Sequence, residues 1–262
     1  MPRYALGVEY DGTEYLGWQT QHQEPTVQAT LERALSFVAA APISVICAGR
    51  TDTGVHALGQ VVHFDSPVER PLRAWVLGCN SRLPASLALR WACPVSDQFH
   101  ARYAARRRRY RYRIVRRPTR PALDARYAVW VREALDVAAM RQAAATLIGE
   151  HDFTSFRTVA CQAPSPVRTV HRIEFIERED TLDLHFEANA FLHHMIRNLV
   201  GSLMVVGRHE QSPDWIARVL AARDRTLAGP TAPAHGLTFM AALYPAEHGL
   251  PAEHSLAPEH AP

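Results

Sequence analysis

The alternation of hydrophobic and polar residues predicts that strands and helices follow one another in two successive halves of the chain. In the first half, the spacing predicts a strand over 4–10, which Asp11 and Gly12 close, and a helix that Thr26 caps. The other elements expected there are strands over 43–48 and 60–64, a helix over 73–82 and a strand over 87–91. The predicted order is therefore β-α-β-β-α-β.

The second half repeats this order of elements without repeating the sequence. The pattern predicts strands over 107–115, 170–176, 182–187 and 237–243, and helices over 136–148, 191–206 and 213–222. Ser212 is placed to cap the last of these helices, and Pro213 suits its first position. The prediction is an α+β fold with a duplicated split β-α-β arrangement, in which two mainly antiparallel sheets join and leave a cleft between the halves.

The length of 262 residues fits two domains of ordinary size. We expect an N-terminal α+β domain over 1–104 and a C-terminal α+β domain over 105–245. After Pro245, small residues, prolines and Glu-His pairs follow one another with no apolar period. Residues 246–262 are therefore expected to form a disordered tail.

The composition argues against several classes of protein. No run of eighteen apolar residues could span a membrane, and the N-terminus lacks the basic and apolar regions of a signal peptide. The four cysteines are scattered, without the paired spacing of a disulfide framework or a zinc site. These features predict a cytoplasmic protein.

The basic residues are unusual because all 29 of them are arginines. Without lysine, the chain cannot use Schiff-base chemistry or a phosphate-binding P-loop. The net charge is +3, and the stretch after Pro245 contributes three glutamates and no arginine, so the rest of the chain is more basic than this value. An excess of positive charge favours a polyanionic partner.

The densest block of charge is 102–117, which contains nine arginines and no acidic residue. Arginines alternate with apolar residues inside it, so that positions 110, 112 and 114 share one face of a strand and positions 109, 111 and 113 share the other. A run of charges is usually a solvated face. Arginine interleaved with tyrosine instead suits RNA, because guanidiniums bind phosphates and aromatic rings stack on unpaired bases.

The strongest candidate chemistry lies between Ala48 and Phe64, in the segment AGRTDTGVHALGQVVHF. This segment places Arg50, Asp52 and His56 in a glycine-bracketed turn between two short strands. Loops at the end of a sheet commonly carry catalytic residues. The alternative is a salt-bridged hairpin in which Asp52 only stabilises the turn.

The whole segment favours the catalytic interpretation, because it resembles the signature of the tRNA pseudouridine synthase A family. That signature reads Ala-Gly-Arg-Thr-Asp, one variable residue and Gly-Val-His-Ala, and it matches 48–57 with Thr53 in the variable place. Further segments agree in the family's order, namely VEYDGTEYLGWQ (8–19), FHARY (99–103), RRYRY (108–112), GEHDFTSFR (149–157) and NAFLHHMIRNLVGSL (189–203). The resemblance extends from about Tyr4 to Pro245.

The resemblance implies two ferredoxin-like (RRM-like) domains and an isomerase that converts uridine in tRNA to pseudouridine by base flipping. It implies that Asp52 is the catalytic nucleophile and that Arg50 fills the space that the flipped nucleotide leaves. Tyr110 matches the tyrosine that stacks on the uracil, and Arg197 matches the arginine near the aspartate, whose guanidinium favours the charged carboxylate. The alternative for Tyr110 is a tyrosine of the core, and the alternative for Arg197 is an ordinary solvent-facing arginine. Whether Asp52 attacks ribose C1′ or uracil C6, or mainly assists proton removal, stays open.

The family's RNA contacts match two further segments, Phe99 to Tyr103 and the loop around Cys161 to Pro164. The residues expected to bind RNA are Tyr110, Phe99, His100, Ala101, Arg102, Tyr103, Arg109, Arg111 and Gln162. No cofactor is expected, because substrate and product contain the same atoms.

The histidines are interpreted as structural residues. We expect His193 and His194 to be adjacent helical residues, which point about 100° apart and share one metal poorly, so no metal is expected. His56 and His63 are expected to hydrogen-bond the loop and the sheet. The histidines near the C-terminus look incidental, and they are His248, His254 and His260.

The resemblance also implies a substrate and an assembly. The substrate is uridines 38, 39 and 40 of the tRNA anticodon stem-loop, and the assembly is a homodimer whose protomers share one tRNA.

Three alternative functions remain. A module that only binds RNA would not explain a carboxylate beside an arginine. A hydrolase of glycosidic bonds would require a second carboxylate near Asp52, and the motif has none. A pseudouridine synthase for another RNA differs only in its substrate.

Overall fold

The chain divides into two compact units. The computed structural model describes residues 1–21 and 25–256. The first unit contains Met1–Arg108 together with the stretch that begins at Thr238, and the second contains Arg109–Leu237. The division after Arg108 lies near the expected boundary at 104, but the end of the chain belongs to the first unit. No helix in the described ranges is long and apolar enough to cross a membrane.

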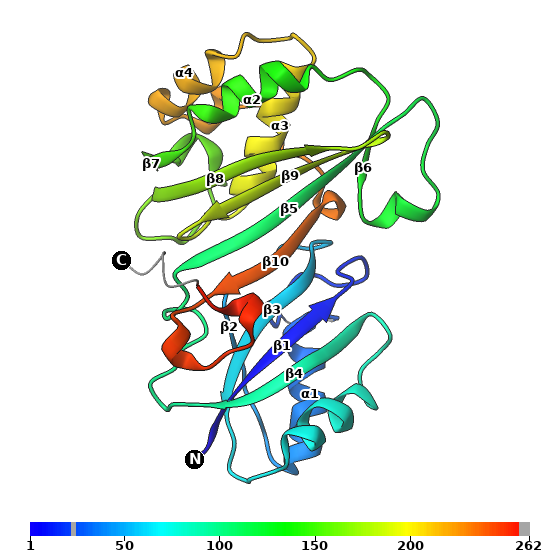
Figure 1. The fold of residues 1–262 in the computed structure, drawn as a ribbon, viewed down its shortest axis with the longest axis vertical. Helices are drawn as coiled ribbons and strands as arrows, with labels where there is room; N and C mark the ends of the chain where they lie inside the picture. Colours follow the sequence, from blue (N-terminus) through cyan, green and yellow to red (C-terminus); the bar gives the residue numbers. More distant parts are fainter. Residues whose placement is uncertain (22–24, 257–262) are drawn as a thin grey trace. The chain divides into compact units, whose positions relative to one another are not determined.

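The first unit is built on a sheet with the strand order β4-β1-β3-β10 (Figure 1). Its strands are β1 (Arg3–Tyr10), β2 (Ile46–Cys47), β3 (His56–Asp65), β4 (Leu87–Val95) and β10 (Leu237–Leu243). β1 runs antiparallel to both β3 and β4, and the short β2 runs antiparallel to β3. β10 runs parallel to β3, so the sheet is mixed but mainly antiparallel, as the predicted α+β class requires.

Helix α1 (Val27–Ala39) begins where the sequence predicts. The hydroxyl of Thr26 accepts a hydrogen bond from the backbone N–H of Ala29 at 3.4 Å, which satisfies one of the unpaired donors at the helix start. Leu31 and Leu35 are fully buried on its inner face. The predicted helix over 73–82 is confirmed as a helical stretch over 72–80. Its central part, Ala74–Gly78, is a π-helix that packs against α1 and β4.

The predicted strand over 43–48 is wrong in length, because only Ile46–Cys47 pairs with β3. The backbone before it bonds to the side chains of α1 instead. The N–H of Ile43 donates to Ser36 Oγ and the N–H of Val45 donates to Glu32 Oε1, both at 2.9 Å. Side chains of the helix thus replace a neighbouring strand as hydrogen-bond partners.

The second unit has a sheet with the strand order β5-β9-β8-β7. Its strands are β5 (Arg107–Arg116), β6 (Val129–Val131), β7 (Gly149–Asp152), β8 (Val167–Glu177) and β9 (Thr181–Ala188). β8 is antiparallel to β7 and β9, whereas β6 is parallel to β5. The sequence pattern did not predict β6 or β7, which are too short to show a clear period.

Three helices complete the second unit, α2 (Val137–Ala145), α3 (Met195–Gly207) and α4 (Trp215–Ala222). α2 packs against α3 and β8, and α4 contacts α2 and α3 (Figure 1). Asp136 caps α2 by accepting the N–H of Ala139 at 2.9 Å. The predicted cap of α4 is wrong, because the helix begins at Trp215 and the Ser212 backbone carbonyl, rather than its side chain, accepts the Trp215 N–H.

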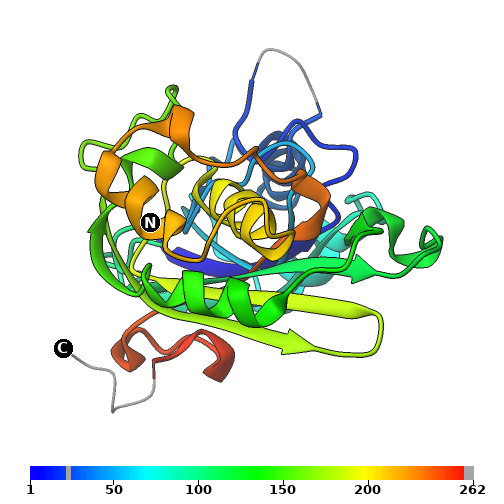
Figure 2. The ribbon, with the colours of Figure 1, turned by 90° about the horizontal axis from the view of Figure 1, so that it is seen from above.

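The C-terminal stretch is the largest departure from the prediction. Instead of a disordered tail, residues 246–256 form two short 3₁₀ turns, Ala246–His248 and Ala252–His254, on the first unit. A bridge joins Tyr244 to Ser255. Figure 2 shows this red segment on the side of the first unit's sheet opposite α1. The remaining part of the predicted tail, 257–262, lies outside the described residues.

His254 is the anchor of this stretch, and it is not incidental. Its side chain is 1% exposed, and its Nδ1 lies 3.0 Å from the carbonyl oxygen of Ala242 on β10. Its ring packs against Trp91 of β4, with 5.4 Å between the ring centroids. A Pro- and Glu-rich segment thus gains a fixed conformation from one buried ring.

We expect His254→Ala to lower the free energy of unfolding by about 1–3 kcal/mol, because the substitution removes a buried hydrogen bond and a ring contact. Glu253→Ala is the matched control, since Glu253 is exposed in the same turn. Its effect should stay within about 0.5 kcal/mol. Urea unfolding of both variants measures the difference, and equal stabilities would contradict the anchoring role of His254.

Candidate active site

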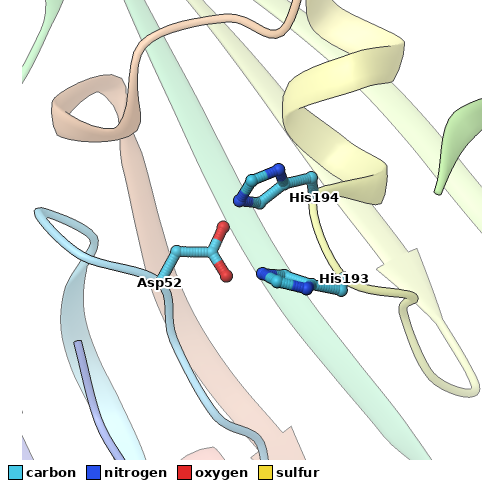
Figure 3. A group of neighbouring side chains, drawn as sticks. All are labelled: Asp52, His193 and His194. Carbon is cyan, nitrogen blue, oxygen red and sulfur yellow. The ribbon is translucent and has the colours of Figure 1, made fainter. Parts of the chain in front are cut away.

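Asp52 lies in the loop of residues 48–55, which connects β2 to β3. The loop begins as a continuation of the hairpin, since the N–H of Ala48 donates to the carbonyl of Val61 at 2.8 Å. A turn follows, in which the N–H of Val55 donates to the Asp52 carbonyl at 3.1 Å and Gly54 has a φ of 77°. The carboxylate of Asp52 extends from this loop and is half-buried (Figure 3).

The segment that follows β1 supports the loop from one side. The N–H of Trp18 donates to the carbonyl of Thr51 at 3.0 Å, and the N–H of Gly12 donates to Nδ1 of His56, also at 3.0 Å. Gly17 has a φ of 88°, and a Cβ there would lie 2.9 Å from the Thr51 oxygen and 3.2 Å from the carbonyl carbon of Asp52. Only glycine allows the two backbones to approach so closely.

Gln60 and Arg108 support the loop from its other side. The Gln60 amide donates to the Gly49 carbonyl at 2.6 Å and accepts the Gly49 N–H at 3.4 Å. The buried guanidinium of Arg108 donates to the carbonyls of Ala48 (3.3 Å), Ala105 (2.8 Å) and Arg102. The backbone on either side of Arg50 is therefore fixed, while the Arg50 side chain itself is exposed.

Cys47 is the other nucleophilic side chain near the loop, and its environment makes it a poor nucleophile. Burial raises the pKa of the Cys47 thiol to about 12, against a smaller opposing effect of the Arg50 charge. A thiol is reactive only as its thiolate. Asp52 is therefore the stronger candidate for covalent chemistry in this loop.

Tyr110 lies on β5, whose side chains alternate as the sequence predicts. Arg108, Tyr110, Tyr112 and Ile114 are buried. The ring of Tyr110 meets the edge of the Phe191 ring, with 5.1 Å between centroids. The Tyr112 hydroxyl donates to the Pro233 carbonyl at 2.8 Å, which fits the core role preferred for it from the sequence.

The arginines on the other face of β5 are largely paired with acids. These acids come from β9, because the 102–117 segment contains none. Arg109 bonds to Glu187, and Arg113 makes two hydrogen bonds to Asp183 at 2.7 and 2.8 Å. Burial opposes the ionisation of Asp183, but its bonds with Arg113 bring its pKa below the ordinary value. Arg111 differs, since its buried Nε has no hydrogen-bond partner. Two of the three arginines on this face therefore bond to acids, so we no longer expect the whole face to bind phosphates.

The FHARY segment, 99–103, contains both buried and exposed members. Phe99 and Ala101 are fully buried, and the Ala101 N–H donates to Nδ1 of His63 at 3.1 Å. Burial lowers the pKa of His63 to about 4, so its ring is an uncharged acceptor at neutral pH. Tyr103 is 73% exposed and stacks on His100 at 4.2 Å between centroids.

A cation contributes to this exposed stack. The guanidinium of Arg102 lies 5.6 Å from the centre of the Tyr103 ring. We call His100, Arg102 and Tyr103 the exposed stack. It combines positive charge with an aromatic face, which is the combination that single-stranded nucleic acids favour.

Arg197 lies in the first turn of α3, in the second unit. Every other residue of α3 is buried, whereas Arg197 is half-buried. Its Nε donates to the Ala232 carbonyl at 2.8 Å, which orients the guanidinium. The close approach of Gly201 to the 230–232 segment holds that segment against the helix, because a Cβ there would lie 1.7 Å from the Pro230 oxygen.

His193 and His194 precede α3 and are not helical, so the geometric argument made for them from the sequence is wrong. They form a turn in which His194 has a φ of 62°. Their rings lie 4.3 Å apart between centroids and are tilted by 59° (Figure 3). The expected RNA contact Gln162 is exposed in the 161–164 loop of the same unit.

The predicted catalytic residues are thus distributed over the two units. Asp52 and Arg50 belong to one loop of the first unit, and Tyr110 and Arg197 belong to the second. Sequence reasoning missed the residues that fix this loop, which are Tyr10, Gly17, Thr51, Gln60 and Arg108. Their signal was available only as position inside the family segments 8–19, 48–64 and 108–112, because hydrogen bonds between distant residues leave no local pattern.

Comparison with known proteins identifies the family of this chain. The family described as tRNA pseudouridine synthase matches residues 7–104 and 143–245. A tRNA pseudouridine synthase A from Xanthomonas euvesicatoria pv. vesicatoria is 56% identical over 251 residues, covering 95% of this chain and 98% of that protein. The tRNA pseudouridine synthase A of Xylella fastidiosa is 54% identical over 252 residues, covering 96% of this chain and 98% of that protein.

Among solved structures, a crystal structure of an archaeal box H/ACA sRNP complex matches with a TM-score of 0.35 and 13% identity, covering 77% of this chain and 44% of that one. So low a score adds nothing to the assignment, which rests on the two bacterial relatives and the family match. By these, the chain belongs to the tRNA pseudouridine synthase A family, a family of isomerases.

Proposed function

We propose that this enzyme converts uridines 38, 39 and 40 of the tRNA anticodon stem-loop to pseudouridine, with Asp52 as its catalytic nucleophile. The observation that carries the proposal is a half-buried carboxylate on a loop whose backbone is fixed from both sides. An acid in catalysis must be reachable by the substrate and held in place. The three positions themselves come from the family resemblance.

The reaction rearranges one nucleotide without gain or loss of atoms. The N1–C1′ bond breaks, the uracil rotates, and a C5–C1′ bond forms. C5 loses its proton and N1 ends with one, so no cofactor or energy source is required. Asp52 acts in the covalent step, by attack at ribose C1′ or uracil C6 or by assisting proton removal.

Three further residues act on the same uridine in this proposal. Arg50 takes the place of the flipped nucleotide, which its exposed side chain on a fixed backbone supports. Tyr110 stacks on the uracil and accepts the C5 proton. Arg197 favours the ionised form of Asp52, and the bond of its Nε to Ala232 supports a defined direction for its guanidinium.

The exposed stack is the best supported RNA contact outside the catalytic residues. Arg102 and Tyr103 offer a phosphate ligand and a stacking surface. Phe99 and Ala101 are fully buried, so the expectation that they touch RNA directly is dropped from the proposal. Arg111 and Gln162 remain in the proposal as contacts, whereas Arg109 already bonds to Glu187.

The proposal includes a homodimer in which one tRNA contacts both protomers, and a reaction in the cytoplasm, where tRNA is found. Both points rest on the family resemblance. A hydrolase of glycosidic bonds is the weaker alternative, because the loop that carries Asp52 contains no second acid to activate water.

We expect Asp52→Asn to abolish tritium release from 5-tritiated uridine in tRNA. The amide is nearly the same size as the carboxylate but cannot act as a nucleophile. Binding of tRNA should stay within about three-fold of the wild type, since the loop retains its backbone hydrogen bonds. Full activity of this variant would remove Asp52 from the proposed role.

We expect Arg197→Gln to lower the single-turnover rate by about 100-fold, because the charge that supports the Asp52 carboxylate is lost. Arg218→Gln is the control, since it removes an exposed arginine from α4 of the same unit. That control should react at the wild-type rate. Equal rates for both variants would argue against a catalytic role of the Arg197 charge.

Binding of tRNA should weaken steeply with salt, because phosphate contacts displace counterions. We expect Arg102→Gln to reduce the slope of log Kd against log salt concentration by about 0.7–0.9, the value of one phosphate contact. Arg90→Gln removes an equal charge from the exposed side of β4 and should leave the slope unchanged. A slope that Arg102→Gln does not alter would exclude the exposed stack as a phosphate contact.

A further inference from the structure

The hydroxyl of Tyr10 bonds to one residue of the loop that carries Asp52. Tyr10 is the last residue of β1 and is 4% exposed. Its hydroxyl lies 2.8 Å from Oγ1 of Thr51, which is 7% exposed. On β3, the fully buried Gln60 bonds to both the N–H and the carbonyl of Gly49.

These bonds hold the residues directly before and after Arg50. Gly49 is fixed on one side of it through Gln60, and Thr51 is fixed on the other side through Tyr10. The Thr51 carbonyl is also bound, by the Trp18 N–H at 3.0 Å. Asp52 therefore follows a residue whose side chain and carbonyl are both held.

We propose that Tyr10, Thr51 and Gln60 form a set of positioning residues that fixes the backbone on both sides of Arg50 and thereby aligns Arg50 and Asp52 for the reaction. This inference rests on the proposed roles of these two residues. We call the three residues the loop clamp. None of them needs to touch the substrate, since the clamp acts through the backbone that it holds.

The chemistry of the clamp suits a permanent support. Burial raises the pKa of Tyr10 above its ordinary value, so the hydroxyl stays protonated at physiological pH. A neutral hydroxyl can donate one hydrogen bond and accept another at the same time. It can therefore bond to Thr51 as donor or as acceptor.

The decisive variant is Thr51→Val, which keeps the shape of the side chain and removes its hydroxyl. Thermal unfolding of this variant checks that it folds. We expect kcat to fall by about 10- to 100-fold, because a shift of the reacting groups by about 1 Å costs a factor of this size. The KM for tRNA should change by less than about three-fold, since the RNA contacts are intact.

Two further variants separate positioning from a general structural effect. Thr51→Ser restores the hydroxyl and should recover most of the wild-type kcat. Tyr10→Phe removes the other end of the same bond and should lower kcat as Thr51→Val does. Because both changes break one interaction, the double variant should be scarcely slower than either single variant.

Ser66→Ala is the matched control for the loss of a buried hydroxyl in the same unit. Ser66 is fully buried directly after β3, at the opposite end of that strand from the loop, and its hydroxyl donates to the Val68 carbonyl at 2.6 Å. We expect it to lower the melting temperature about as much as Thr51→Val does. Its kcat should equal that of the wild type.

Single-turnover tritium release, tRNA binding and thermal unfolding of these variants decide the question. A wild-type kcat for Thr51→Val beside an inactive Asp52→Asn would overturn the loop clamp and leave the proposed function standing. An equal loss of kcat in Ser66→Ala and Thr51→Val would also overturn it, because stability alone would then explain the loss. Full activity of Asp52→Asn would instead overturn the proposed function, and the clamp with it.

Discussion

The site depends on hydrogen bonds that fix a stretch of backbone outside any helix or strand. The loop of residues 48–55 receives them from β3 through Gln60, from the segment after β1 through Trp18, and from Arg108 just before the second unit. A surface loop usually exposes its side chains, but its backbone is usually mobile. Here the backbone is held like that of a strand while Asp52 and Arg50 extend from it. The combination is what a reaction on an extruded base requires.

Arginines of β5 are paired with acids on the neighbouring strand β9 and not with acids nearby in the sequence. The block of residues 102–117 contains nine arginines and no acid, yet β9 places Glu187 and Asp183 directly beside it. Arg108 is satisfied by backbone carbonyls and serves the catalytic loop. Acids and carbonyls thus bind several of these arginines, and the RNA contact that we propose is the exposed stack around Tyr103.

Much of the fold could be predicted from the sequence, because its elements have clear periods and boundaries. The strand over 237–243 and the capping role of Thr26 are both confirmed. The failures share one physical cause, which is that a distant residue supplies the partner. Side chains of α1 satisfy the backbone near Val45, and Trp91 receives His254. Neither partner can be recognised from its own neighbourhood in the chain.

The candidate site shows the same limit. Its candidate catalytic residues Asp52 and Arg50 belong to a signature that can be read directly and lie two positions apart. The signature does not reveal which of its members act on the substrate and which hold the backbone. Thr51 stands between the two candidates, and its hydroxyl faces a buried tyrosine more than forty positions earlier. The turn that carries His193 and His194 was likewise hidden, because a helical period continues through it.

The return of the chain end to the first unit has a consequence for biosynthesis. A ribosome releases residues 109–237 as one continuous stretch, so the second unit is complete in sequence before translation ends. The first unit includes residues 1–108 but lacks β10 and the turns around His254 until the stretch that begins at Thr238 emerges. Until β10 is made, β3 therefore lacks a partner for His56 and Ala57 on that edge, whereas β2 already pairs with Val62 and His63.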